Sequence, residues 1–431
     1  ATQTLPGGYT QSDEQDTTGS ATARTYTRTS DGTVLAADTV SENTHSQTVV
    51  HGGTPGVTAS QTYTYDNTGR LTQTQDTGAD AVCTTRTYTF DKNSNRKTLA
   101  TATADVGLDC TTTGAVTTTN SYDSADRLVN TGYTYDNLGR TTALPGTTLA
   151  YYADDLVQQQ TAGTQRQTWT LDSNLRFRGW TTETNTSGTW TTTATKTNHY
   201  DSDSDSPRWI TEDTSGSLTR NIDGPAGDLA ATSSATGATV LQLTNLHGDI
   251  ALQLPLDTTI APTVLDTDEF GNPRPGQQPT RYGWIGAKTR STETPTGLAL
   301  MGARLYNPTT GRFLSTDPVP GGSANAYDYC NADPVNCYDL NGQWPHWRRY
   351  LRRVRHRAIH YMRHHRMFHI AHVVLYRTYH NHYVRACTVW GGSAAGPVIV
   401  YGWWGGEFSA GLSALTFGFG CAGGMAGYAW N

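Results

Sequence analysis

The first 340 residues of this 431-residue chain lack long amphipathic helical patterns, which argues against a helical body. Lysine is scarce, and the six cysteines include no CxxC pair of the kind that binds zinc. The chain begins at Ala1 without a basic start, an apolar run or a cleavage site, so we expect no signal peptide there. Threonine and glycine dominate instead, and this composition favours an all-β body.

A short pattern recurs along this β-type sequence. The clearest copies are Tyr-Asp-Asn-Thr-Gly-Arg at 65–70 and Tyr-Asp-Asn-Leu-Gly-Arg at 135–140, and weaker copies occupy 90–96 and 122–128. A repeat this short is one supersecondary unit, so many copies must stack before a core is buried. The pattern therefore predicts a long sheet. The first copies look like the middle of an array, so we expect the chain to be a fragment of a longer protein.

The residue types in one copy predict a strand, a tight turn and a second strand. Asp66 can accept hydrogen bonds from the backbone amides ahead of it, and Gly69 can take positive φ at the end of the turn. In the weaker copies we expect Asn95 and Asp126 to replace the glycine, because these residue types tolerate left-handed geometry best after glycine.

This array resembles the YD repeats of the bacterial RHS family. The resemblance implies a mostly β fold, namely a shell of antiparallel β-hairpin repeats that spirals around a cargo polypeptide. A small helical or glycine-rich tail would follow at the C-terminus. The alternatives are a generic β-solenoid and an adhesin stalk.

Residues 269–343 carry a more specific pattern. The segments are GLALMGARLYNP at 297–308, TGRFLSTDP at 310–318, NADPVN at 331–336 and YDLNGQ at 338–343. Together they resemble the RHS repeat-associated core domain nearly end to end. The resemblance divides the chain into three parts, which are a YD-repeat shell at 1–230, the core domain at 231–343 and a variable C-terminal cargo at 344–431.

In that family the core domain cuts the chain after its last motif and releases the cargo. The resemblance implies an aspartic-protease-like pair, Asp317 and Asp339, in which one carboxylate activates water and the other carboxyl group polarises the carbonyl. Arg304 would match the arginine of the family motif and orient a carboxylate by a bidentate contact. The scissile bond would join Gln343 to Trp344. No other enzymatic activity is expected, and neither a cofactor nor a metal is implied.

Three residues depart from the family pattern. Asn307 replaces an aspartate in a turn, Leu340 replaces the proline after the second aspartate, and Gln343 replaces leucine at the cut. The last two departures lie in the reacting segment, so the resemblance supports cleavage less directly than it supports the fold. A structural alternative is that Asp317 and Asp339 only form turns.

Charge and cysteines separate the tail from the body. Residues 344–431 hold ten of the 31 basic residues and one acid, a net charge of +9, whereas the rest of the chain carries −15. Such an asymmetry suggests separate roles.

The even cysteine count favours an oxidising compartment, although six reduced thiols are the alternative and the disulfide connectivity is not predicted. The cysteines fall into three sequential pairs, Cys83 with Cys110, Cys330 with Cys337 and Cys387 with Cys421.

The tail pattern predicts a basic amphipathic helix at 344–382, rich in arginine and histidine, and an uncharged stretch at 408–430 that is long enough to span a bilayer. A membrane-inserting toxin is the leading hypothesis. A nuclease is the second, disfavoured because no catalytic spacing with acids is present. A hydrophobic plug packed against the shell is the structural alternative.

The leading functional hypothesis is thus a secreted or cell-surface bacterial protein that encloses and releases its own C-terminal cargo. Its expected partners are that cargo, an immunity protein, a secretion apparatus and a membrane, with nucleic acid less favoured. The competing hypothesis is a cell-surface adhesin with a C-terminal membrane anchor. A conventional enzyme acting on a diffusible substrate ranks last.

Overall fold

The computed structural model describes residues 1–54, 60–78, 80–319 and 323–343, which belong to one compact unit, Ala1–Pro345. Within these residues nearly all regular structure is antiparallel β, so the predicted mostly β fold is confirmed. The predicted tail helix, the uncharged stretch and the scissile-bond residue Trp344 lie outside the described residues.

The first sheet has ten strands, and each pairs with the next along the chain. This order is that of consecutive hairpins, as the repeats predict. The strands are β1 (Thr2–Leu5), β2 (Tyr9–Gln15), β3 (Ala21–Arg28), β4 (Val34–Glu42), β5 (Thr48–Thr54), β6 (Ser60–Tyr65), β7 (Leu71–Thr77), β8 (Cys83–Phe90), β9 (Arg96–Thr103) and β10 (Val116–Thr119).

The second sheet continues the same order over thirteen strands. Its β20 spans the predicted division between residues 230 and 231. The strands are β11 (Thr134–Tyr135), β12 (Thr141–Leu144), β13 (Thr147–Tyr151), β14 (Val157–Ala162), β15 (Gln165–Leu171), β16 (Phe177–Thr186), β17 (Thr189–His199), β18 (Trp209–Thr211), β19 (Leu218–Asp223), β20 (Leu229–Ser234), β21 (Thr239–Thr244), β22 (Ile250–Pro255) and β23 (Thr263–Val264).

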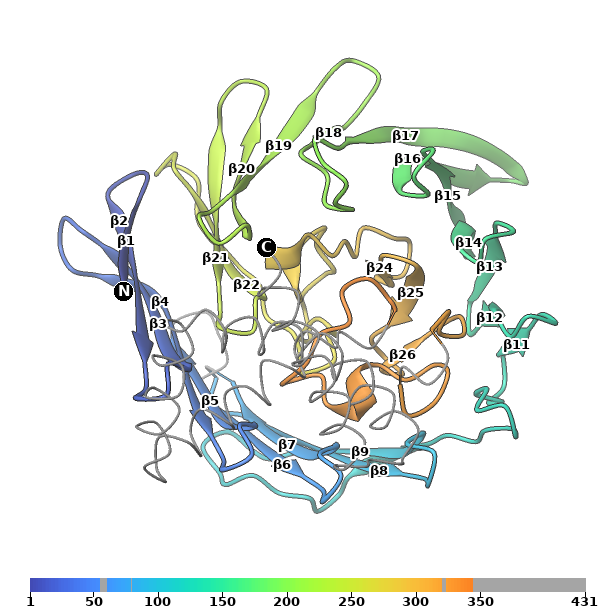
Figure 1. The fold of residues 1–431 in the computed structure, drawn as a ribbon, viewed down its shortest axis with the longest axis horizontal. Helices are drawn as coiled ribbons and strands as arrows, with labels where there is room; N and C mark the ends of the chain where they lie inside the picture. The colour runs from blue at the N-terminus through green and yellow to red at the C-terminus, as the bar shows by residue number, and fades with distance from the viewer. Residues whose placement is uncertain (55–59, 79, 320–322, 344–431) are drawn as a thin grey trace, which may run out of the picture. The chain divides into compact units, whose positions relative to one another are not determined.

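A third, small sheet carries the residues of the candidate site. It consists of β24 (Ala299–Met301), β25 (Arg304–Asn307) and β26 (Arg312–Phe313), flanked by the short helices η1 (Gly286–Lys288) and η2 (Cys330–Ala332). Figure 1 shows the strands of both large sheets curving around it. We call residues 266–343 the inner segment.

Hydrophobic clusters attach the inner segment to both sheets. Leu298 and Leu305 share a cluster with Trp169 of the second sheet, and Phe270 packs with Tyr88 of the first. The first sheet also meets the second, because side chains of β2–β4 and of β20–β22 form one further cluster. The hairpin array therefore returns on itself, as expected of a spiralling arrangement.

Each repeat is linked to the next by an arginine. Asp66 Oδ1 accepts the backbone amides of Thr68 and Arg70 at 2.9 and 3.1 Å, and its Oδ2 accepts Arg70 Nε at 2.7 Å. Arg70 Nη1 then donates to the carbonyl oxygen of Asp91 at 3.1 Å, while its guanidinium lies 4.9 Å from the centre of the Phe90 ring. The tyrosine–aspartate turn of one hairpin is thereby bonded to the corresponding turn of the following one.

The same geometry recurs at three further turns, which explains why aspartate, arginine and the aromatic residue keep their spacing. In each, an aspartate pairs with the arginine four residues later, and that arginine covers the aromatic ring of the next turn. The sets are Asp123–Arg127 over Tyr135, Asp136–Arg140 over Tyr151 and Asp172–Arg176 over Tyr200.

Positive φ at the end of the turn is confirmed for Gly69 (φ 87°) and for Asp126 (φ 60°). The expectation for Asn95 is wrong, because Ser94 occupies the left-handed position there with φ 63°. Asn95 instead stands where the clear copies have arginine. Its side-chain amide donates to Asp91 Oδ2 at 3.0 Å, so it replaces the arginine contact within its own turn.

Two of the three sequential cysteine pairs form disulfides, a connectivity that the sequence did not predict. Cys83–Cys110 closes a loop beside the edge of the first sheet, and Cys330–Cys337 closes a short loop around η2. The third pair lies beyond residue 343, outside the described part. Disulfides persist in oxidising compartments, which agrees with the compartment that the composition favours.

We predict that Arg140→Lys lowers the free energy of unfolding by about 1–2 kcal/mol, because lysine keeps the charge but loses the planar guanidinium that bonds Asp136 and covers Tyr151. Urea denaturation followed by tryptophan fluorescence measures the change. Arg28→Lys is the matched control, since Arg28 pairs with Asp31 on an exposed turn and its replacement should have little effect. Equal effects of the two substitutions would contradict the repeat-to-repeat link.

Candidate functional site

The structure brings together the three residues that the core-domain pattern predicts. Arg304 opens β25, Asp317 follows β26, and Asp339 lies beyond η2. The Nη2 atom of Arg304 is 3.0 Å from Asp317 Oδ2 and 2.9 Å from Asp339 Oδ2. The expected bidentate contact to one carboxylate is therefore replaced by one guanidinium nitrogen shared between two carboxylates.

Backbone amides fix the second oxygen of each carboxylate. Asp317 Oδ1 accepts the Val319 amide at 2.8 Å, as in a turn that begins at an aspartate. Asp339 Oδ1 accepts the Gln343 amide at 3.0 Å. Turn formation and a shared arginine thus occur in the same two residues, so the structural alternative describes part of their role. The Gln343 contact also holds the main chain next to the predicted scissile bond.

The remaining donors of Arg304 bind main-chain carbonyls. Its Nε donates to the Gly342 carbonyl oxygen at 2.6 Å, and its Nη1 donates to that of Ala326 at 3.3 Å. The guanidinium carbon lies 3.6 Å from the centre of the Phe313 ring. The side chains of Arg304 and Asp339 are 1% and 0% exposed, so this group of charges is removed from water.

The end of the inner segment fits closely against the β24–β25 turn. Gly342 has φ 63°, and a Cβ there would stand 2.6 Å from the Met301 carbonyl oxygen, so only glycine allows this approach. The Ala303 amide donates to the Asn341 carbonyl at 3.0 Å. Leu340, which replaces the usual proline, packs against the apolar cluster of the small sheet. This packing accommodates the change from proline to Leu340.

Burial governs the electrostatics of the site. It raises the pKa of Asp339, and the nearby Asp317 raises it further, against the opposing effects of Arg304 and the Gln343 amide. Burial also lowers the pKa of Arg304, although both carboxylates act to raise it. Two buried carboxyl groups that share one cation favour a state in which one of them keeps a proton. Such a pair can supply a general base and a general acid at the same time.

A third carboxyl group near Arg304 was missed by the sequence analysis. Asp328 is only 4% exposed and lies between the buried Tyr327 and Tyr329. An acidic residue flanked by two core tyrosines was the available signal, but the family pattern assigns no role to that position.

The NADPVN motif anchors the segment that carries Asp339. Asn336 Oδ1 accepts the Thr48 amide at 2.8 Å, and Asn336 Nδ2 donates to the Tyr65 hydroxyl at 2.9 Å. The Nε2 atom of His247 is 3.0 Å from the Pro334 carbonyl oxygen. These contacts join the motif to β5, to β6 and to the β21–β22 turn, so both large sheets position the site.

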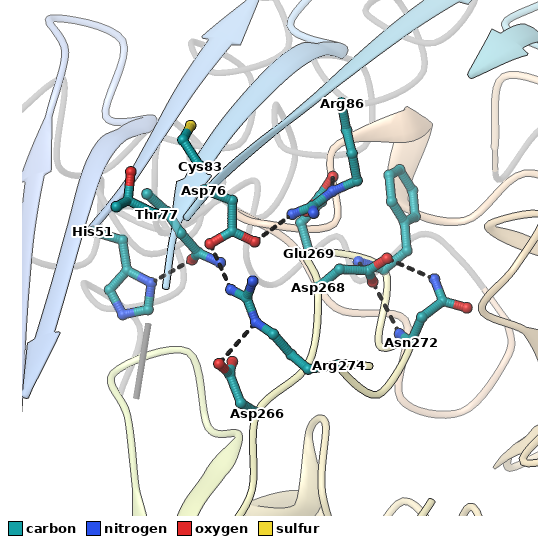
Figure 2. Close-up of polar contacts among 12 residues, drawn as sticks. His51, Asp76, Thr77, Cys83, Arg86, Asp266, Asp268, Glu269, Asn272 and Arg274 are labelled. Atoms are coloured by element: carbon teal, nitrogen blue, oxygen red, sulfur yellow. Dashed lines mark hydrogen bonds and ion pairs between the residues drawn. The ribbon is translucent and has the colours of Figure 1, made fainter. Parts of the chain in front are cut away.

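Buried ion pairs attach the start of the inner segment to the first sheet (Figure 2). Arg86 of β8 lies 2.7 Å from Asp76 of β7 and 2.6 Å from Glu269 of the inner segment. Arg274 joins Asp76 to Asp266, at 2.5 and 2.8 Å. The side chains of Asp76 and Glu269 are fully buried, so each depends on its arginine for charge compensation.

Two classes of site are absent from the described part of the chain. No group of three or more histidine, cysteine, aspartate or glutamate side chains there could hold a metal ion. No helix among residues 1–343, outside the undescribed gaps, has the length and apolarity needed to cross a bilayer.

No family model matches the chain. Curated relatives match a short stretch, and the chain spans about 4% of their length. The tRNA nuclease WapA of Bacillus subtilis and the tRNA(Glu)-specific nuclease WapA of B. subtilis subsp. natto are each 35% identical to it over 111 residues, which is 23% of this chain and 4% of the relative.

Solved structures match over a much larger part. The TcdB2-TccC3-Cdc42 crystal structure has a TM-score of 0.64 and 16% identity, covering 78% of this chain and 18% of that one. TcdB2-TccC3 without its hypervariable C-terminal region gives 0.63 and 17%, with 78% and 18% covered. The Photorhabdus luminescens Tc holotoxin pore gives 0.64 and 17%, with 79% and 18% covered. At such identities the likeness establishes a shared fold.

We predict that Arg86→Met lowers the free energy of unfolding by about 3–5 kcal/mol, because it leaves Asp76 and Glu269 buried without their shared cation. Chemical denaturation measures the loss. Arg208→Met is the control, since Arg208 forms exposed pairs with Asp201 and Asp223 and should be replaceable with little effect. A small loss at Arg86 would show that the ion pairs do not hold the inner segment.

Proposed function

We propose that this chain is part of an RHS-type toxin, in which a β shell encloses a C-terminal polypeptide and cuts it free between Gln343 and Trp344. The shell would comprise residues 1–230, the core domain 231–343 and the cargo 344–431. The shared fold of TccC3-containing toxin structures and the short match to WapA nucleases support a toxin-related protein at this coarse level. Self-cleavage and the nature of the cargo go beyond that level.

The observation that carries the cleavage proposal is how the site holds the main chain. Arg304 Nε binds the Gly342 carbonyl, and Asp339 Oδ1 binds the Gln343 amide. Both contacts lie immediately before the predicted bond. Because these consecutive main-chain groups are fixed, the next carbonyl along the chain, that of Gln343, would lie within reach of the two carboxyl groups. Orientation of this kind lowers the barrier to reaction within a chain.

In the proposed reaction Asp317 removes a proton from a water molecule, and the water oxygen attacks the Gln343 carbonyl carbon. Asp339, the carboxyl group whose pKa is raised, donates a hydrogen bond and then its proton to the carbonyl oxygen. The tetrahedral intermediate collapses by breaking its bond to the Trp344 nitrogen, which takes up the proton held by Asp317, while one hydroxyl group of the intermediate returns a proton to Asp339. A carboxyl group remains on Gln343 and an amine on Trp344. Arg304 compensates the negative charge of the pair throughout.

The cargo proposal depends on composition. Residues 344–431 carry +9 and include an uncharged stretch at 408–430, a combination typical of a segment that binds and enters a membrane. A nuclease is the second candidate, because the matched WapA relatives are named as tRNA nucleases. We further propose that the protein acts outside its producing cell and has a secretion apparatus and an immunity protein as partners. The two disulfides suit that location.

We predict that mass spectrometry of the purified wild-type chain finds two polypeptides, residues 1–343 and 344–431, and that Asp317→Asn or Asp339→Asn yields one uncut chain. Either change removes a group required for proton transfer, so the rate should fall by at least about a hundredfold. Asp257→Asn, in an exposed turn, is the matched control and should leave cleavage intact. An uncut wild-type chain retained at the cell surface would support the adhesin alternative instead. Cleavage that survives both site substitutions would exclude the carboxyl pair.

We predict that the cleaved wild-type chain releases dye from vesicles containing anionic lipid, and that uncut Asp317→Asn releases none, because its tail stays enclosed. Fluorescence dequenching measures the release. Degradation of RNA without dye release would favour the nuclease candidate. If the cleaved chain neither releases dye nor degrades RNA, and its expression does not arrest growth, the toxin proposal is refuted.

A further inference from the structure

We propose that Asp328 is a positioning residue that acts through Arg304 and raises the pH to which the Asp317–Asp339 pair keeps its shared proton. The inference rests on the proposed self-cleavage, and it assigns to that site a third carboxyl group that does not touch the reacting bond. Three features support it: Asp328 lies two residues after Ala326, whose carbonyl accepts a hydrogen bond from Arg304; its side chain is buried; and one of its oxygens has no donor among the described residues.

The chain around Asp328 forms an additional strand-like pairing beside β26. The Phe313 amide donates to the Tyr327 carbonyl at 2.9 Å, and Asp328 forms an antiparallel bridge with Arg312. The Ala326 carbonyl, two residues earlier, accepts the Asp317 amide at 2.8 Å. The segment that carries Asp328 is therefore bonded both to the strand beside Arg304 and to one member of the acid pair.

Asp328 is 4% exposed, and its Oδ2 has no hydrogen-bond partner among the described residues. The neighbouring arginine of β26 does not supply one, because Arg312 Nη1 donates to Asn95 Oδ1 at 2.7 Å and Nη2 donates to the Asp126 carbonyl at 2.5 Å. The donors of Arg304 are likewise directed to the acid pair and to main-chain carbonyls. A buried carboxylate oxygen without a donor is costly, which favours a protonated carboxyl group.

Burial raises the pKa of Asp328 to about 7, against the attraction of Arg312 and Arg304 and the amides of its own segment. The negative charge of Asp328 also acts on the Tyr306 phenol of β25, whose pKa burial raises well above its ordinary value, so that phenol stays neutral. Around neutral pH, Asp328 is consequently the group whose charge changes beside the two arginines.

The sign of the effect follows from Coulomb's law. When Asp328 ionises, it adds a negative charge close to Arg304 and so offsets part of the positive charge that Arg304 presents to the pair. A weaker positive field makes the proton on Asp339 harder to remove. The pair therefore keeps its one proton to a higher pH when Asp328 is ionised. Below neutral pH the Asp328 side chain is uncharged, so replacing it with the neutral side chain of asparagine leaves the charge near Arg304 unchanged.

The test is the pH profile of cleavage in the full chain. Uncut wild-type and Asp328→Asn chains, purified in denaturant, are refolded in buffers from about pH 5.5 to about pH 8.5, and the cut fraction is followed by gel electrophoresis and mass spectrometry. We expect equal rates below pH 7. On the alkaline side the variant's rate should begin to fall at lower pH than that of the wild type, and the ratio of the two rates should level off at about tenfold for each pH unit of displacement.

Controls separate this effect from a loss of structure. Asp268→Asn removes another buried carboxyl group with a raised pKa, of about 6, located in the turn that contacts the first sheet, and it should leave the profile unshifted. Asp328→Glu retains the charge and should retain the wild-type alkaline limb. If Asp328→Asn does not refold, the smaller neutral Asp328→Ser replaces it in the same comparison.

Alkaline limbs with the same midpoint pH in wild type and Asp328→Asn, or a rate lowered equally at every pH, would overturn the inference, because a purely structural residue acts independently of pH. A profile of Asp328→Asn shifted to higher pH would also overturn it. A wild-type chain that cuts at no pH would instead refute the proposed function itself, and the two failures are thus distinguishable.

Discussion

Arginine side chains buried between the large sheets and the inner segment are the interaction on which this structure depends. Apolar clusters around Trp169 and Tyr88 also join the large sheets to the inner segment, and the arginines lie where the same junction buries polar groups such as Asp76. Arg86 binds Glu269 across that junction, and Arg96 covers the Phe270 ring at 4.1 Å. A guanidinium combines several donors with a flat apolar face, so it can join polar and aromatic partners at once.

Arg304 uses the same chemistry at the end of the described chain. In the repeats an arginine connects one turn to the next, and Arg86 connects sheet to inner segment. Arg304 instead connects two carboxyl groups of the inner segment to the Gly342 carbonyl. The candidate site is therefore a specialised form of the contact that builds the rest of the fold. Its burial, rather than its residue types, separates it from an ordinary turn.

Local features were predictable because they depend on short spacing. Tyrosine, aspartate and glycine at fixed offsets predicted the hairpins, and the error at Asn95 arose from a misplaced offset of one residue. The three site residues were predictable only through family resemblance. The Arg86–Glu269 pair joins residues 183 positions apart, and no local sequence pattern predicts it. Asp328 was missed for a similar reason, since its burial depends on β25 and β26.

If the proposed self-cleavage takes place, the site holds its own substrate, and this would limit when it can act. Asp339 lies four residues before Gln343 and holds its amide, while Arg304 reaches the same stretch only after β24 and β25 have paired. The NADPVN motif must also dock on β5 and β6 to place Asp339. Cutting in the proposed reaction would therefore occur once per chain, and only after distant strands have assembled. A partly folded chain would keep its cargo attached, because its acid pair would still be apart and exposed to water.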